Sequence, residues 1–144
     1  MSSGDDPLVG TWKLVSSTRK DVESGEESHT YGSHPTGFLN YSAGGRMMVV
    51  IAGDSRKPPS GPVPTDAEIV AWFKSAMAYA GTYTVEGNQV THHVEASSEP
   101  LRAGARLVRF FRLDGKVLTL TAAPARHWMD GRVSVPTIVW EKIE

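Results

Sequence analysis

Apolar and polar side chains alternate along most of the chain, and Gly, Pro and Asp separate the alternating segments. Alternation with a period of two is typical of strands that bury one face. The first such segment places Leu8, Trp12 and Leu14 on one side, and Thr11 and Lys13 on the other. The pattern predicts strands over residues 8–18, 28–31, 36–41, 46–51, 82–85, 89–97, 105–113, 116–122 and 133–143.

Two connections between these strands have the composition of tight turns. Ser42-Ala43-Gly44-Gly45 separates two apolar strands, and glycine reaches the positive φ values that hairpin turns need. Asp114-Gly115 is the strongest hairpin signal, because a two-residue type I′ turn favours that dipeptide. Residues 52–64 are rich in proline, which cannot donate to a strand ladder, so this segment is predicted to be a loop, as are residues 100–104 and 123–131.

One segment has a helical pattern instead. Thr65-Asp66-Ala67-Glu68 matches a capping box, in which the Thr and Glu side chains bond the free amides of a first helical turn. Apolar residues then recur with helical spacing at Ile69, Trp72, Phe73, Ala76, Met77 and Ala80. Gly81 would end the helix. The predicted helix is roughly 24 Å long and either packs on the sheet, the simpler alternative, or lies across its open end.

Eight or nine strands with short connections and one mid-chain α-helix predict a mainly β fold. An up-and-down antiparallel β-barrel would remove the exposed edges of such a sheet, and a two-sheet sandwich is the alternative. A length of 144 residues fits one domain. We expect a disordered polar tail over residues 1–7 and a single barrel domain over residues 8–144.

Composition limits the partners of this barrel. The 15 Lys and Arg nearly balance the 16 Asp and Glu, so we expect no nucleic acid or membrane partner. The absence of cysteine excludes disulfides and a thiolate nucleophile, and leaves only His and carboxylate ligands for any zinc site. The acidic N-terminus lacks a signal-peptide pattern and no window is long and apolar enough to span a membrane, so the expectation is a soluble, cytoplasmic monomer or homodimer.

Several segments, in order, resemble one family. Leu8-Val9-Gly10-Thr11-Trp12-Lys13-Leu14-Val15 looks like the G-x-W first strand of lipocalin-like proteins. Tyr79-Ala80-Gly81-Thr82-Tyr83-Thr84-Val85-Glu86-Gly87, Val90-Thr91-His92-His93-Val94-Glu95, Arg109-Phe110-Phe111-Arg112-Leu113-Asp114-Gly115, Leu118-Thr119-Leu120 and Val139-Trp140-Glu141 are similar to the bacterial and fungal lipocalin-like domain family. The resemblance implies a calycin-type barrel that holds a small hydrophobic molecule. Related barrels include carriers and also cofactor-free cyclases and isomerases, so the fold does not decide the function.

Strand register selects the candidates for chemistry inside such a barrel. His92 shares its face with Val90 and Val94, and a histidine that titrates near neutral pH can act as a general acid or base. The simpler alternative is a core histidine bonded to a neighbouring strand. Arg109 lies on the apolar face of its strand, where it either stacks on Trp12 or pairs with an anionic oxygen of a ligand.

Other residues are candidates for the lining of the cavity. Tyr41 and Tyr83 could donate hydrogen bonds to a carbonyl, and we assign His92, Tyr83 and Arg109 as catalytic candidates. The ligand-binding candidates are Trp12, Tyr41, Met47, Val49, Trp72, Met77, Val90, Val94, Phe111 and Trp128. His127, His29 and His34 could ring the entrance, whereas Glu95 and Glu99 are expected to be solvated. No spacing fits a metal or nucleotide motif, so no metal and no cofactor are predicted.

Three functions remain open at this point. In the first, the barrel folds a small hydrophobic, secondary-metabolite-type substrate for cofactor-free cyclisation, isomerisation or dehydration, with His92 as the acid or base. In the second, the same cavity carries or sequesters an apolar ligand without changing it. In the third, the interior is filled by side chains and the protein is an interaction module.

Overall fold

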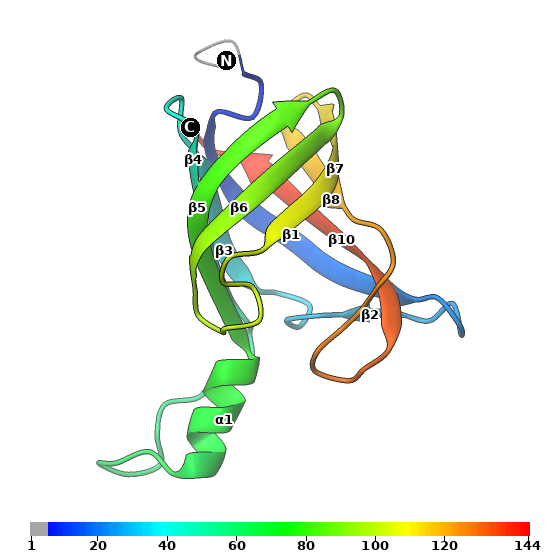
Figure 1. Ribbon diagram of the computed structural model, residues 1–144. Coiled ribbons are helices and arrows are strands. Elements are labelled where there is room, and N and C mark those ends of the chain that lie inside the picture. The colour runs from blue at the N-terminus through cyan, green and yellow to red at the C-terminus, as the bar shows by residue number, and fades with distance from the viewer. Residues whose placement is uncertain (1–5) are drawn as a thin grey trace.

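A computed structural model of the protein describes residues 6–144, which form one antiparallel barrel with one helix below it (Figure 1). The elements follow the chain order β1 (Gly10–Asp21), β2 (Glu27–His29), β3 (Thr36–Tyr41), β4 (Arg46–Ala52), α1 (Asp66–Lys74), β5 (Ala76–Glu86), β6 (Gln89–Ser97), β7 (Arg106–Asp114), β8 (Val117–Thr121), β9 (Ala125–Arg126) and β10 (Val133–Lys142).

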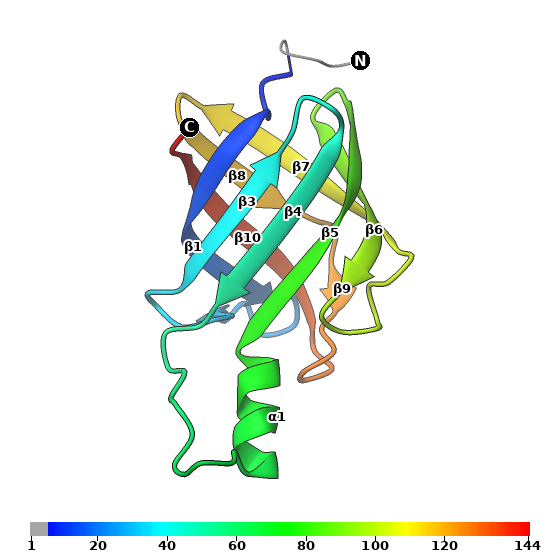
Figure 2. The same cartoon turned by 90° about the vertical axis from the view of Figure 1, so that its left-hand side faces the viewer.

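Pairing of the first long strand with the last one closes the barrel. The order of the strands is β2-β1-β3-β4-β5-β6-β7-β8-β10-β9, and β1 also pairs with β10. Eight antiparallel strands therefore form the wall, while the short strands β2 (Figure 1) and β9 (Figure 2) pair beside the lower ends of β1 and β10. This arrangement confirms the predicted mainly β barrel and excludes the sandwich.

Most of the predicted strands have nearly the predicted bounds. Two of them, β3 and β6, match without change, and only the fifth is much longer than expected. The short strand β9 lies in a segment predicted to be a loop. At the predicted hairpin, Asp114 pairs with Val117, so the central turn residues are Gly115 and Lys116, one position later than expected. Gly115 has φ +63°, the left-handed conformation that such a turn requires.

The prediction of a helix as far as Ala80 is wrong. The helix ends at Lys74, and residues from Ala76 onward form β5, where they pair with β4 from Ala52 to Arg46. In this strand Met77 and Tyr79 are buried inside the barrel, a burial that a helix projecting from the wall would not provide. The helical spacing of alanine and methionine was therefore outweighed by strand pairing and by burial of the alternate residues.

Gly81 continues β5 instead of ending a helix. The pairing of β5 with β6 shifts by one residue between Ala80 and Gly81, which marks a β-bulge. A Cβ at Gly81 would collide with the carbonyl oxygen of His93 on the neighbouring strand. Glycine is needed here because the two backbones approach closely.

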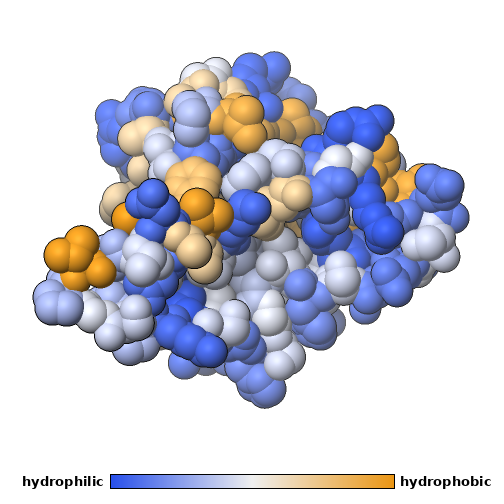
Figure 3. Space-filling view, turned by 90° about the horizontal axis from the view of Figure 1, so that it is seen from below, coloured by the Kyte–Doolittle hydropathy of each residue, from blue (hydrophilic) through white to orange (hydrophobic). Residues whose placement is uncertain are grey.

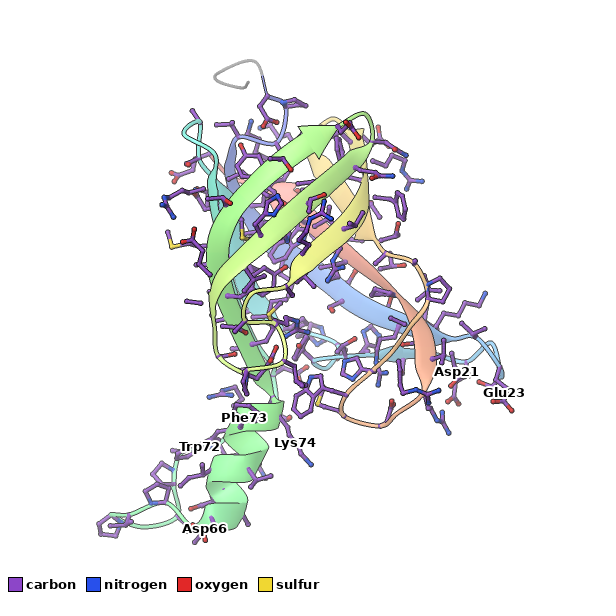
Figure 4. The ribbon with its side chains drawn as sticks, viewed as in Figure 1. Asp21, Glu23, Asp66, Trp72, Phe73 and Lys74 are labelled. Carbon is purple, nitrogen blue, oxygen red and sulfur yellow. The ribbon has the colours of Figure 1, made fainter. Side chains whose placement is uncertain are left out.

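The first turn of α1 has the predicted capping box. The amide of Glu68 donates to the Thr65 hydroxyl at 3.1 Å, and a Glu68 carboxylate oxygen accepts from the Thr65 amide at 2.8 Å. The hydrogen bonds that the Glu68 carboxylate accepts from the Thr65 and Ser60 amides hold its pKa below the usual value. The helix projects below the barrel with Asp66 at its far end, and none of its residues is buried (Figure 4). It therefore neither packs on the sheet nor covers the barrel.

The opposite end of the barrel is closed by side chains. Leu8 and Trp12 are buried there, and the Trp12 indole donates to the Leu8 carbonyl at 3.0 Å. Asp6, in the predicted tail, accepts from the Leu8 amide at 2.8 Å, whereas residues 1–5 of that tail lie outside the described residues. Among residues 6–144, no helix has the length and apolar character needed to cross a membrane.

Candidate functional site

The barrel interior holds a cavity of about 470 Å³. That volume is within the range of sites for small molecules. Apolar side chains from most of the wall line it, namely Leu39, Val49, Met77, Leu107, Leu120 and Ile138. At the lower end the lining continues through Thr30, Tyr31 and residues 122–128, and we call this end the mouth. The interior is therefore not filled by its own side chains, contrary to the third function considered above.

Three side chains form a hydrogen-bonded row at the wall of this cavity. His92 on β6 is 2% exposed, and its Nε2 lies 2.6 Å from the Tyr41 hydroxyl on β3. Its Nδ1 lies 2.7 Å from the Tyr79 hydroxyl on β5. Of the three, His92 and Tyr79 line the cavity, whereas Tyr41 lies behind them. We call this row the Tyr-His-Tyr relay.

The bonding pattern fixes where the protons of the relay lie. Tyr41 is 1% exposed, and among residues 6–144 its hydroxyl has only His92 Nε2 as a partner. Since a buried hydroxyl proton needs an acceptor, Tyr41 donates to Nε2, and the neutral ring carries its proton on Nδ1. That Nδ1–H then donates to the Tyr79 oxygen. The Tyr79 hydroxyl proton is consequently free to be donated to a molecule in the cavity.

Burial keeps all three groups of the relay in their neutral forms. It lowers the pKa of His92 to about 3, and the nearby Arg109 and His93 act in the same direction. Burial also raises the pKa of the Tyr41 hydroxyl well above its usual value and raises that of Tyr79. Arg109 opposes both of these increases. At neutral pH the site thus offers a neutral hydrogen-bond donor beside a guanidinium.

That guanidinium has no carboxylate partner in the described chain, unlike those of Arg19 and Arg102 at the same cavity. Arg109 lies on the inward face of β7, lines the cavity and makes no ion pair with any of residues 6–144. Its Nη1 donates to the carbonyl of the adjacent Val108 at 3.2 Å. It does not stack on Trp12, whose ring instead lies 5.7 Å from the Lys142 ammonium. A half-buried cation without a partner favours an electron-rich oxygen in a bound molecule.

Two other arginines at the cavity are paired with carboxylates. Arg102 Nη1 lies 2.7 Å from Glu99 Oε1, and Arg19 Nη2 lies 2.8 Å from Asp130 Oδ2. The bond from Arg19 lowers the pKa of Asp130 to about 2. Glu99 is 4% exposed and lines the cavity, so the expectation that it is solvated is wrong. The sequence spacing gave no sign of its pairing with Arg102.

Aromatic side chains connect the mouth to the helix. Trp128 lines the cavity, stacks on His127 and meets the Phe73 ring of α1 edge to face, with 5.9 Å between the centroids. Burial lowers the pKa of His127. Seen from below, this end of the molecule shows hydrophobic side chains between hydrophilic ones (Figure 3). His29 and His34, which were also expected at the entrance, do not line the cavity.

The structure brings five of the predicted site residues to the cavity. These are His92, Arg109, Val49, Met77 and Trp128. The other eight do not line the cavity. Trp72 lies on the helix and Phe111 on β7. The rest are core residues of the wall and the closed end, namely Tyr83, Trp12, Tyr41, Met47, Val90 and Val94. The Tyr83 hydroxyl lies 2.9 Å from the Ser42 carbonyl and 3.0 Å from an Asp6 carboxylate oxygen at the closed end. The Trp72 indole donates to the Lys57 carbonyl at 2.7 Å, so Trp72 secures the loop before α1.

Sequence reasoning missed Tyr79, because the residue was assigned to a helix. The alternation of Met77, Tyr79, Gly81 and Tyr83 would have placed it on an inward face. Arg19 and Trp140 also line the cavity and were not predicted as site residues. Among residues 6–144, no group of three or more His, Cys, Asp or Glu side chains is placed to hold a metal ion.

The match to a family model agrees with the architecture. The family described as "Lipocalin-like domain" matches residues 9–143. No curated protein matches the chain. A crystal structure of a lipocalin-like protein from Bacteroides uniformis is similar to the chain, with 12% sequence identity and a TM-score of 0.49. The match covers 94% of this chain and 98% of that one.

Proposed function

Because the chain belongs to the lipocalin-like domain family, we propose that its barrel binds a small, mainly apolar molecule and promotes a cofactor-free isomerisation, cyclisation or dehydration of it. The observation that carries the proposal is the Tyr-His-Tyr relay at the wall of the cavity. It leaves the Tyr79 hydroxyl proton available to a carbonyl oxygen of the bound molecule. Apolar lining supplies the remaining contact area.

In this proposal Tyr79 is the group that touches the substrate, and His92 acts through it. Both ring nitrogens of His92 are already bonded, and its pKa of about 3 keeps it neutral at physiological pH. A histidine in that state is a poor proton donor but a good positioning residue. Its Nδ1–H polarises the Tyr79 oxygen and so strengthens the bond that Tyr79 donates.

Arg109 and Glu99 supply the charges that the reaction requires. As electron density moves onto the substrate oxygen, the unpaired Arg109 guanidinium would stabilise it. A concerted cyclisation requires no proton transfer, whereas isomerisation requires an acceptor that takes a proton from one carbon and returns it to another, and dehydration requires one that takes a proton from carbon and passes it to the departing hydroxide to form water. Glu99 is the carboxylate that lines the same cavity, and we assign it that role.

Binding without reaction is the second candidate. It is favoured by the completeness of the relay, in which the imidazole has no free nitrogen and does not titrate near neutral pH. A carrier would use Tyr79 only to orient the carbonyl of its cargo. The two candidates predict the same binding and different chemistry.

The fluorescent naphthyl ketone prodan tests both candidates. Its emission shifts to longer wavelength when its carbonyl accepts a hydrogen bond, and its α-hydrogens exchange in D2O if the ketone is enolised. We expect prodan bound to the wild type to emit at longer wavelength than prodan bound to Y79F, and we expect the wild type to accelerate deuterium uptake, as measured by mass spectrometry. Y79F should abolish both effects, while Y83F serves as the control because Tyr83 lies outside the cavity.

The result identifies which candidate holds. Prodan binding without faster exchange would exclude the isomerisation and dehydration that use Glu99 as proton acceptor, and would favour the carrier. Equal emission and exchange in the wild type and Y79F would refute the role of Tyr79 in either function.

A further inference from the structure

The outside of the barrel wall carries a continuous apolar surface. The strands β1, β3, β4 and β5 lie side by side there (Figure 2), and the residues that alternate with their buried ones point away from the cavity. Six of these outward residues are apolar, namely Val15, Phe38, Met48, Val50, Ala78 and Ala80. We call this surface the outer face.

The large side chains of the outer face are left in contact with solvent. Met48 is 61% exposed and Val15 is 52% exposed, while the values for Val50 and Phe38 are 48% and 40%. Side chains of this size have about 150–200 Å² of surface each, so the four leave about 350 Å² of apolar surface uncovered. An apolar patch of about 300–600 Å² is often a functional surface.

Charged residues at the rim of the outer face suit a second copy of this chain. Lys13 of β1 lies in register with Glu141 of β10 on one side. On the other side, Arg46 Nη1 of β4 lies 3.1 Å from Glu95 Oε1 of β6. A nucleic acid or an anionic bilayer favours a rim of positive charge alone, whereas a rim with both signs can meet its own copy without net repulsion.

The pairing of β4 with β5 makes the outer face complementary to itself. Met48 lies in register with Ala80, and Val50 with Ala78, so two large side chains lie beside two small ones. Consider a two-fold axis in the plane of contact, parallel to the strands and between β4 and β5. This axis places Met48 and Val50 of one subunit over Ala80 and Ala78 of the partner subunit. Large side chains then fill the space above small ones, as close packing of two sheets requires.

We propose that the protein forms a symmetric homodimer through the outer face, with Met48 and Val50 of each subunit packed on Ala80 and Ala78 of the partner subunit. Two such faces cover about 700 Å² of apolar surface, and the rim raises the total to about 1,000 Å², the lower limit for a specific interface. We therefore expect a dissociation constant of about 10 μM. This inference goes beyond the proposed function, because the outer face points away from the cavity.

Sedimentation equilibrium between about 1 and 200 μM protein measures the dissociation constant of the dimer. M48E would bury a carboxylate against an apolar surface, so it should raise the dissociation constant at least about 30-fold. V22E is the matched control, because Val22 is 55% exposed and lies outside the outer face, beyond the end of β1. This control should dimerise as the wild type does.

An exchange of side-chain sizes tests the two-fold arrangement. M48A leaves a space over Ala80 of the partner subunit and A80M overfills it, so each should raise the dissociation constant about tenfold. The double variant M48A/A80M keeps one large and one small residue opposite each other, so it should return to within about threefold of the wild type. V50A/A78V is a second exchange of the same kind, and valine suits a strand position if A80M does not fold.

A monomer at every concentration would overturn the proposal. A dimer that M48E leaves unchanged would overturn the outer face as its interface. Single variants that weaken the dimer without recovery in either exchanged pair would overturn the two-fold arrangement. Neither Met48 nor Val22 lines the cavity, so wild type, M48E and V22E should bind prodan equally, and a failure of the proposed function is seen separately.

Discussion

The free energy of unfolding should fall as the pH drops from 6.5 to 5, because His92 must stay neutral in the folded protein. Burial, reinforced by Arg109, lowers the pKa of His92 to about 3, whereas an imidazole in the unfolded chain titrates near 6.5. Below pH 6.5 the unfolded state therefore binds a proton that the folded state does not. The stability from this residue is complete above pH 6.5 and is lost progressively as the pH falls toward 3.

The size of the effect follows from the difference between the two pKa values. Each pH unit within this window removes about 1.4 kcal/mol, so pH 5 costs about 2 kcal/mol and the whole window about 5 kcal/mol. A domain is typically stable by about 5–15 kcal/mol, so His92 could decide acid unfolding. Carboxylates such as Asp130, with a pKa of about 2, lose their contribution only at lower pH. Between pH 6.5 and 5 the change in the free energy of unfolding therefore comes mainly from the histidines.

Urea unfolding at pH 7, 6 and 5 measures this dependence in the wild type and in H92Q. Glutamine keeps hydrogen-bonding groups between the two tyrosines but cannot titrate. H92Q should thus be less stable at pH 7 and should lose less stability on acidification. H127Q is the comparison, and it should change the slope less because His127 is only half-buried. Equal wild-type stability at pH 7 and 5, or an unchanged slope in H92Q, would refute the reasoning.

Three further substitutions test the fold and the relay. G81A should destabilise the protein by about 3 kcal/mol in thermal unfolding, because its Cβ collides with the His93 carbonyl and the β-bulge must move. T65A should weaken the first turn of α1 by about 1 kcal/mol, seen as faster amide exchange there, with almost no change in the global midpoint because the helix buries no residue. Y41F should cost about 1–3 kcal/mol in urea unfolding by leaving His92 Nε2 without its donor, and Y41F with H92F should cost less than the sum of the single changes.

The barrel could be predicted from the sequence because its main determinant is local. A wall with one buried face imposes period-two alternation on every strand, and tight turns impose glycine between them. β3 and β6 were therefore predicted at their observed bounds. β9 was missed, since two residues such as Ala125 and Arg126 are too few to show a period.

Residues 76–80 show where local patterns become ambiguous. Ala76, Met77 and Ala80 fit a helical stripe, while Met77 and Tyr79 fit an inward strand face equally well. The decision lies in the pairing with β4 and β6, which no local window contains. Tyr79 was therefore missed because its segment fits both a helix and a strand, and its residue type played no part.

The candidate site also depends partly on local sequence and partly on contacts between distant strands. Register within one strand was sufficient to place His92 inside the barrel, but its state depends on Tyr41 and Tyr79 from two other strands. Burial lowers the pKa of His92 and keeps its ring neutral, and the two hydrogen bonds make that ring a link that orders a hydroxyl. The chemistry predicted for His92 therefore moves to Tyr79, because burial and two hydrogen bonds leave the tyrosine as the only member of the relay with a proton to offer the cavity.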